Sequence, residues 1–175
     1  MKTDIKLVSR AKKGDKAAFN ELYEQLYPEL YRYAAWFMGS ESYATEALLD
    51  ATLTVWQKLP QLRKEENFKA WYYKILSNCC KKIARDNLKN SYIPLDDTEN
   101  FLADENALSY EDKATLQWAM SQLRDDEKEI ILLSVCGGYT SAEIGKQVGK
   151  SDGTVRSILS RGLKKLKKLM DTEEL

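Results

Sequence analysis

Apolar residues in this chain recur at the three- and four-residue spacing that is typical of α-helices, and alternating runs that would indicate strands are scarce. The first clear stripe predicts a helix that starts at Asp15, a favourable N-cap, after a short leading helix that ends at Gly14. The stripe consists of Phe19, Leu22, Tyr23 and Leu26. Pro28 suits the first turn of a helix, so we expect a new helix to begin there and to end at Gly39.

Two longer helices are predicted next, over about 43–59, closed by Pro60, and over about 68–85. The segment after them has a different composition. Between Ser91 and Asp112 there are seven acidic residues, no Lys or Arg, and only scattered apolar positions. Such a segment cannot bury a helical face, so we expect a flexible acidic linker over 91–112.

The helical pattern returns after the linker. Helices are predicted over about 113–123 and 126–136, and Gly137-Gly138 then breaks the chain before two last helices. The expected fold class is all-α, with four principal helices on each side of the linker. We therefore expect two small helical domains joined by an acidic flexible linker, the second of which ends in a helix-turn-helix.

The predicted helix-turn-helix has specific end signals. Thr140 and Glu143 have the spacing of a capping box for a short helix, and Gly149 can supply the left-handed turn that ends it. Ser151 would cap the last helix. The inward positions of that helix would be Val155, Ile158, Leu159, Leu163, Leu166 and Leu169.

The opposite face of the last helix is polar and basic, and its members are Arg156, Ser157, Ser160, Arg161 and Lys164. Side chains near the start of such a helix can reach base edges, and Arg suits a bidentate contact with guanine. Lysines further along, at 164, 165, 167 and 168, would meet phosphates. The plainer alternative is a solvated cationic face on an ordinary helical hairpin.

The helix over 68–85 carries a second basic face, edged by aromatic residues. The predicted buried stripe is Phe68, Tyr72, Ile75, Cys79 and Ile83. The adjoining face holds Lys74, Asn78, Lys81, Lys82 and Arg85. Cations around one amide favour contact with a nucleic-acid backbone and an exposed base. Core aromatics beside an ordinary soluble face explain this helix equally well.

Composition narrows the class of protein. Apolar residues make up 43% of the chain, enough for packed cores, while no long apolar run or signal sequence is present, so we expect a cytoplasmic protein without membrane insertion. The chain has no His and three Cys, and no catalytic signature, which predicts no metal, no cofactor and no enzymatic activity. Cys79, Cys80 and Cys136 are expected to be small buried thiols, with a redox role at Cys79 or Cys80 as the alternative.

Charge is unevenly distributed. The formal net charge is zero, but residues 142–170 hold eight basic and two acidic residues. Basic segments on either side of the acidic linker are compatible with DNA binding at zero net charge. A third stretch, 44–56, places Glu46 and Asp50 one turn apart among apolar residues. On the residues alone, this is a buried helix with two acids at its rim.

The order of these segments resembles the extracytoplasmic-function (ECF) sigma factors of bacterial RNA polymerase. The resemblance is carried by Gly14-Asp15-Lys16-Ala17-Ala18-Phe19, by Asp50-Ala51-Thr52-Leu53-Thr54-Val55-Trp56, by 68–78, and by the terminal helix-turn-helix with Gly153-Thr154-Val155-Arg156-Ser157. It covers nearly the whole chain outside the linker. Within it, Leu49 and Thr52 stand where the family often has Gln and Phe, and Ile158 and Ser160 replace commonly basic or His positions.

The resemblance implies a role for each segment. Residues 1–90 would be the sigma region 2 domain, 91–112 the linker and 113–175 the region 4 domain. Glu46, Asp50 and Trp56 would dock on the β′ clamp helices of core RNA polymerase, whose β subunit is also an expected partner. The basic face of 68–85 would meet the −10 promoter element, and the terminal helix the −35 element.

Three functions remain possible from the sequence. The first is the sigma factor, with core RNA polymerase and promoter DNA as expected partners and an anti-sigma factor as a further candidate partner. The second is a stand-alone transcriptional regulator that shares the helix-turn-helix, which would need neither the 44–56 helix nor the acidic linker. The third is a helical adaptor without a nucleic-acid role.

Overall fold

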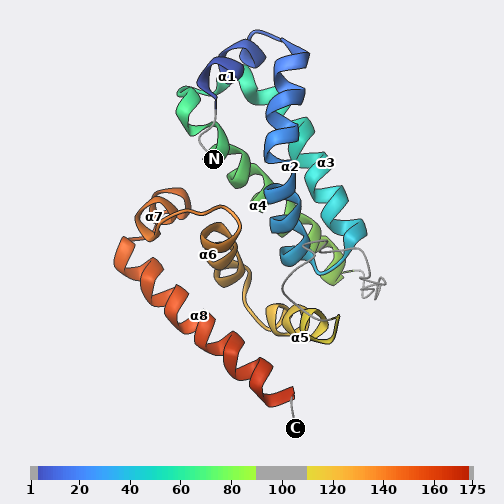
Figure 1. The fold of residues 1–175 in the computed structure, drawn as a ribbon, viewed down its shortest axis with the longest axis vertical. Coiled ribbons are helices and arrows are strands. Elements are labelled where there is room, and N and C mark those ends of the chain that lie inside the picture. Colours follow the sequence, from blue (N-terminus) through green and yellow to red (C-terminus); the bar gives the residue numbers. More distant parts are fainter. Residues whose placement is uncertain (1–3, 90–109, 174–175) are drawn as a thin grey trace.

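The structure, a computed structural model, describes residues 4–89 and 110–173, and within these ranges it is helical with no β-strand (Figure 1). Four α-helices precede the undescribed segment and four follow it. They are α1 Ile5–Lys12, α2 Lys16–Met38, α3 Glu41–Lys58, α4 Phe68–Lys89, α5 Tyr110–Ser121, α6 Asp125–Val135, α7 Ser141–Val148 and α8 Asp152–Glu173. Two 3-10 turns, Leu59–Gln61 and Glu65–Asn67, connect α3 to α4. The predicted all-α fold class is confirmed.

The first helices are divided differently from our prediction, because α2 runs without a break through Pro28. A proline inside a helix lacks the N–H that would bond four residues back, and this costs about 3 kcal/mol. Pro28 lies on the exposed side of α2, while Leu26 and Leu30 on either side of it are buried. Burial of these leucines offsets the missing hydrogen bond. The prediction that a new helix starts at Pro28 is therefore wrong.

Most predicted helix ends are confirmed by their hydrogen bonds. The Asp15 carboxylate accepts from the backbone N–H of Ala18 at 3.1 Å. The Thr140 backbone N–H donates to Glu143 Oε2 at 2.8 Å, and Ser151 Oγ accepts from the Thr154 N–H at 3.1 Å. Gly39 and Gly149 both take the left-handed conformation at helix ends, with φ of 68° and 71°. At these ends the local sequence was therefore sufficient to predict where the helix begins or ends.

The N-terminal bundle, defined as α1–α4, is built around α4, which packs against both α2 and α3. Tyr33, Tyr72, Tyr73 and Phe68 are its largest fully buried side chains. In the C-terminal bundle, defined as α5–α8, Ile130, Leu133, Ile144 and Val155 are fully buried, and they belong to an apolar core that is continuous with that of the N-terminal bundle. The helices α6 and α8 pack against each other, and α7 lies at one end of α8.

The two bundles are in contact, because α6 packs against α2 and α4 (Figure 1). This contact explains why the buried face of α4 is wider than predicted. Tyr73, Leu76 and Cys80 are fully buried, whereas Ile75 and Cys79 of the predicted stripe are only half-buried. A helix with neighbours on two sides buries more than one stripe.

The last helix also differs from its predicted inward face. Leu163 is 50% exposed, although we expected it in the core. Gly162 lies there instead, buried against α6, where an added Cβ would be 2.8 Å from Ile131 Cδ1. The absence of a side chain at Gly162 lets α6 and α8 approach closely, and this rotates Leu163 toward solvent. The other inward positions are buried or half-buried.

Residues 91–109 of the predicted linker lie outside the described residues, and Tyr110–Asp112 form the start of α5. The proposed division of the chain at 90 and 113 therefore stays a prediction. Among the residues that the structure describes, no helix is long and apolar enough to cross a membrane.

Two glycines in the C-terminal bundle give opposite predictions for stability. A Cβ on Gly145 would lie 2.5 Å from the backbone oxygen of Lys150, which cannot move without opening the turn between α7 and α8. We expect Gly145→Ala to lower the free energy of unfolding by about 1–3 kcal/mol. The control Gly162→Ala meets only the flexible end of Ile131 and gains helix propensity, so it should stay within about 1 kcal/mol of the parent. Urea denaturation followed by circular dichroism compares them, and equal losses would contradict the steric argument.

Candidate functional site

The helix-turn-helix is held together by short polar contacts at its turn. The backbone N–H of Lys150 donates to the Gly145 carbonyl at 2.9 Å. Ser141 Oγ donates to the Asp152 carboxylate, which joins the start of α7 to the start of α8. These contacts fix the angle at which α8 leaves the turn, and that angle decides which α8 side chains face outward.

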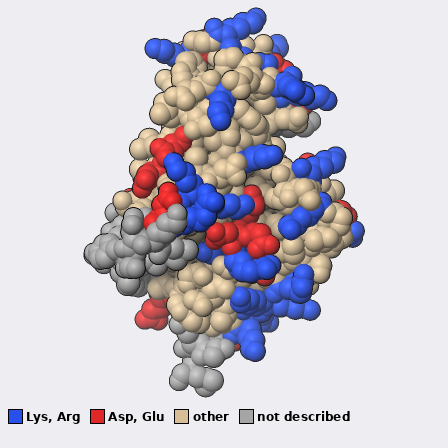
Figure 2. All heavy atoms as spheres, turned by 180° about the vertical axis from the view of Figure 1, so that it is seen from behind, with Lys and Arg blue, Asp and Glu red and all other residues tan. Residues whose placement is uncertain are grey.

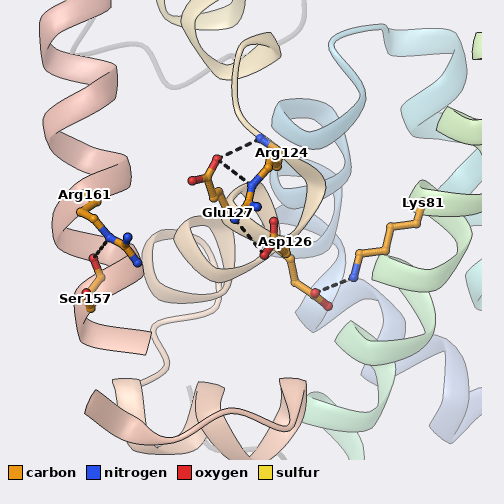
Figure 3. A network of polar contacts seen from close by, with 7 residues as sticks. Lys81, Arg124, Asp126, Glu127, Ser157 and Arg161 are labelled. Carbon is orange, nitrogen blue, oxygen red and sulfur yellow. Dashed lines mark hydrogen bonds and ion pairs between the residues drawn. The ribbon is translucent and has the colours of Figure 1, made fainter. Parts of the chain in front are cut away.

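The five residues predicted to read DNA on α8 are all exposed and lie on its outer side. Two of them are held by neighbours on the same helix. Arg156 Nη2 is 2.6 Å from Asp152 Oδ2. Arg161 Nε donates to the Ser157 carbonyl at 3.3 Å (Figure 3). The contact with Asp152 draws Arg156 toward the start of the helix, the end that enters a groove in known helix-turn-helix proteins.

The basic residues extend along α8 toward its C-terminal end. Figure 2 shows Lys and Arg side chains gathered on the side of the molecule where α8 runs in Figure 1. Lys164, Lys167 and Lys168 are exposed there. Lys165 differs, because its Nζ donates to the Gln122 carbonyl at 2.7 Å and thereby ties α8 to the end of α5. The surface suits a nucleic-acid backbone, because phosphates attract ammonium groups whatever the base sequence.

The second basic face, on α4, is only partly open. Lys74, Asn78, Lys82 and Arg85 are exposed, as predicted. Lys81 is half-buried, and its Nζ lies 2.5 Å from Glu129 Oε2 of α6 (Figure 3). The structure therefore brings four of the five predicted residues to solvent and turns the fifth toward the C-terminal bundle.

A surface groove of about 400 Å³ lies between the exposed sides of α3 and α4, which pack against each other beneath it. Asn78 and Lys82 line one side of it, and Asp50 and Leu53 line the other. Asn78 and Asp50 were predicted to serve different partners, yet they face the same space. A nucleic acid on α4 and a protein on α3 would thus meet at this groove.

The outer face of α3 carries exposed apolar side chains as well as the two predicted acidic ones. Glu46 and Asp50 are exposed, and so are Leu49 and Leu53, at 60% and 58%. Trp56 is half-buried, with its ring centroid 4.9 Å from that of Phe19. These apolar side chains line a pocket of about 390 Å³ together with Lys16, Asn20 and Thr52. An exposed apolar strip next to acids is typical of a protein interface.

Sequence reasoning missed Leu49 and Leu53 as surface residues. One signal was available: this helix has apolar residues around much of its circumference, more than one buried face requires. Which of them would be exposed depended on where α2 and α4 pack, and this was not visible in the periodicity.

The cysteines agree with the expectation of buried thiols. Cys80 and Cys136 are buried and Cys79 is half-buried. Burial raises the pKa of all three, that of Cys136 to about 11, where nearby Arg32 opposes the shift and Glu29 adds to it. A thiol with a raised pKa is a poor nucleophile at neutral pH.

The described part of the chain is thus a helical protein with a helix-turn-helix, a second basic helix and a separate face of exposed apolar and acidic side chains on α3. Residues 22–89 match Sigma-70 region 2, and residues 113–166 match Sigma-70 region 4. Together these matches cover more than half of the chain. It belongs to the sigma-70 family, as a factor of the ECF type.

Similar proteins agree with this assignment. The chain is 25% identical over 169 residues to the ECF RNA polymerase sigma factor SigM of Mycobacterium tuberculosis, covering 97% of this chain and 85% of SigM. Its fold is similar to that of CnrH in complex with the cytosolic domain of CnrY (TM-score 0.71, 22% identity, 97% and 98% covered). It is equally similar to the sigma factor RpoE of Bartonella quintana in complex with the anti-sigma factor NepR (TM-score 0.71, 22% identity, 87% and 96% covered).

The raised thiol pKa values predict slow modification of the native protein. Since burial favours the neutral thiol, the Cys136 thiolate appears only as the pH rises toward about 11. At neutral pH the thiolate is therefore much scarcer at Cys136 than at an exposed cysteine. We expect Ellman's reagent to react much more slowly with the native than with the urea-unfolded chain. Rapid reaction at Cys79 or Cys80 in the native protein would instead support the redox alternative.

Proposed function

We propose that this protein binds core RNA polymerase, recognises the −35 and −10 elements of its promoters and promotes DNA melting and transcription initiation. The observation that carries this proposal is the presence, in one chain, of both sigma regions, each with an exposed basic helix. As a sigma factor it would act with polymerase in the cytoplasm and would not be an enzyme. We propose domains at 1–90 and 113–175, joined by the acidic linker 91–112.

The α3 surface is proposed as the docking site for the β′ clamp helices. Glu46 and Asp50 supply charge for basic partner residues, while Leu49, Leu53 and Trp56 supply apolar area. Apolar anchors surrounded by charges give affinity at the centre of an interface and orientation at its rim. The C-terminal bundle is proposed to contact the β subunit. A stand-alone regulator would have no use for the α3 surface, and this favours the sigma factor.

The two basic helices are proposed to share the promoter. Lys74, Asn78, Lys82 and Arg85 on α4 would contact the −10 element, with Asn78 at the groove where an unpaired base could enter. On α8, Arg156, Ser157, Ser160 and Arg161 would face the −35 element, and Lys164 its phosphates. An anti-sigma factor, as in the complex of RpoE with NepR, is proposed as a further partner that would compete for these surfaces.

Docking on polymerase is tested by charge reversal on α3. Asp50→Lys should weaken association with core polymerase at least about tenfold, because it places a repulsive charge at the rim without touching the buried side of the helix. Glu21→Lys, on the exposed side of α2, makes the same charge change away from α3 and should bind normally. Fluorescence anisotropy of labelled chain titrated with core enzyme measures both. Unchanged binding by Asp50→Lys would make Asp50 an ordinary solvated residue.

Base reading is tested on α8 with a promoter library randomised in the −35 element. Arg156→Ala should cost about 1–3 kcal/mol at preferred promoters and relax preference at one or two positions. The paired change Lys167→Ala/Lys168→Ala should weaken all promoters alike and lower the salt dependence, since those residues lie too far along the helix to reach bases. Run-off transcription by the reconstituted holoenzymes provides the readout. An even loss across the library for Arg156→Ala would make it a positioning residue.

A further inference from the structure

One contact between the bundles places a carboxylate in a basic environment. Glu129 of α6 accepts a hydrogen bond from Ser77 Oγ at 2.6 Å and one from Lys81 Nζ at 2.5 Å, one on each carboxylate oxygen. Ser77 and Lys81 are four residues apart and so lie one above the other on α4. The Glu129 side chain is 13% exposed, and Ser77 is fully buried beneath it. The carboxylate is thus held in a fitted site and is not a loose surface ion pair.

The donors of this site would hold other anions equally well. A hydroxyl and an ammonium group one helical turn apart offer one donor to each of two oxygens, which is the pattern that carboxylates and phosphates share. The site also borders the exposed basic face of α4, because Lys81 is next to Lys74, Asn78 and Arg85 around the helix. A backbone phosphate bound at Ser77 and Lys81 would extend the row of contacts proposed for the −10 element.

Another part of the contact between the bundles leaves polar groups unpaired. Tyr139, just before α7, packs its ring edge-on against Tyr73 of α4 with centroids 5.7 Å apart, and Lys69 lies 5.7 Å from the Tyr139 ring centroid. The hydroxyl groups of Tyr73 and Tyr139 are both buried without a hydrogen-bond partner among the described residues. Separation of the bundles would expose these hydroxyls to water, so they oppose the closed arrangement. These two hydroxyls lower the free-energy cost of separating the bundles.

We infer that Ser77 and Lys81 form an anion-binding site on the N-terminal bundle, filled by Glu129 in the free protein and by a DNA backbone phosphate once the bundles separate. The site itself follows from the contacts, and the assignment of its second occupant to promoter DNA rests on the proposed function. Glu129 then acts as a phosphate mimic in cis. The free chain binds DNA weakly on α4 because the C-terminal bundle competes for the same two donors.

The test measures binding of the free full-length chain to a fluorescent pool of mixed-sequence single-stranded DNA about 16 nucleotides long, enough for one binding site. Glu129→Ala should bind this pool about tenfold more tightly than the parent, because it removes the competing charge-assisted hydrogen bonds. Asp126→Ala is the matched control. It removes the same charge from the same helix, but the Asp126 carboxylate lies 3.3 Å from Arg124 Nη2 of its own bundle (Figure 3). A third variant, Glu129→Ala/Lys81→Ala, should lose the gain.

Each outcome bears on the inference. A gain in Glu129→Ala that is absent in Asp126→Ala and lost with Lys81 supports the site. Equal gains in both single variants would show an effect of net charge alone and would overturn it, as would no gain in Glu129→Ala. Glu129→Gln keeps the shape of the side chain and should show a smaller gain if Glu129→Ala does not fold. Polymerase is absent from this assay, so failure of the chain to bind core enzyme would refute the proposed function and leave the DNA result intact.

Discussion

The position of α4 between two sets of neighbours is the constraint on which the rest of the structure depends. Its inner side must fill the core of the N-terminal bundle, where Phe68, Tyr72 and Leu76 are fully buried. Another side meets α6 through Ser77 and Lys81. What remains is the strip that bears Lys74, Asn78, Lys82 and Arg85. Packing thus decides which cations of α4 are available to DNA.

The same division of a helix surface occurs on α3 and α8. On α3 the small residues Ala44, Ala47 and Ala51 are buried and allow close packing, while Leu49 and Leu53 are left outside. On α8 the buried Gly162 allows α6 to approach, and Leu163 is turned outward. In both helices small residues occupy part of the buried side, and some of the larger apolar residues are left facing solvent. Apolar area left on the surface in this way is available to a large partner such as polymerase.

Interactions between the bundles connect the two surfaces that we propose to bind DNA. The ionic contact of Glu129 and the aromatic contact of Tyr139 both end on α4, within three turns of each other along the helix. A protein that must span two promoter elements needs its two readers apart, whereas the described arrangement holds them together. The binding energy of polymerase and DNA would then be used in part to separate the bundles, which makes specific binding depend on the complete assembly.

The sequence by itself determined the helical fold class, most helix ends and which polar side chains of α8 are exposed. These features depend on local chemistry: the side-chain oxygens of Asp15, Thr140 and Ser151 accept from nearby backbone N–H groups, and Gly149 adopts its turn without help from distant residues. The continuity of α2 through Pro28 was not predictable in this way, because distant core contacts outweigh a local penalty.

Only the tertiary structure decided which side of α4 is free and where Lys81 points. Periodicity identifies a polar strip but not the neighbour that approaches it. Glu129 lies 48 residues from Lys81 in the chain, and no local pattern relates them. Exposure of Leu49 and Leu53 had the same origin, since it depends on how α2 and α4 pack around α3. Local hydrogen bonds can be read from neighbouring residues, whereas competition for a shared surface arises only when distant helices meet.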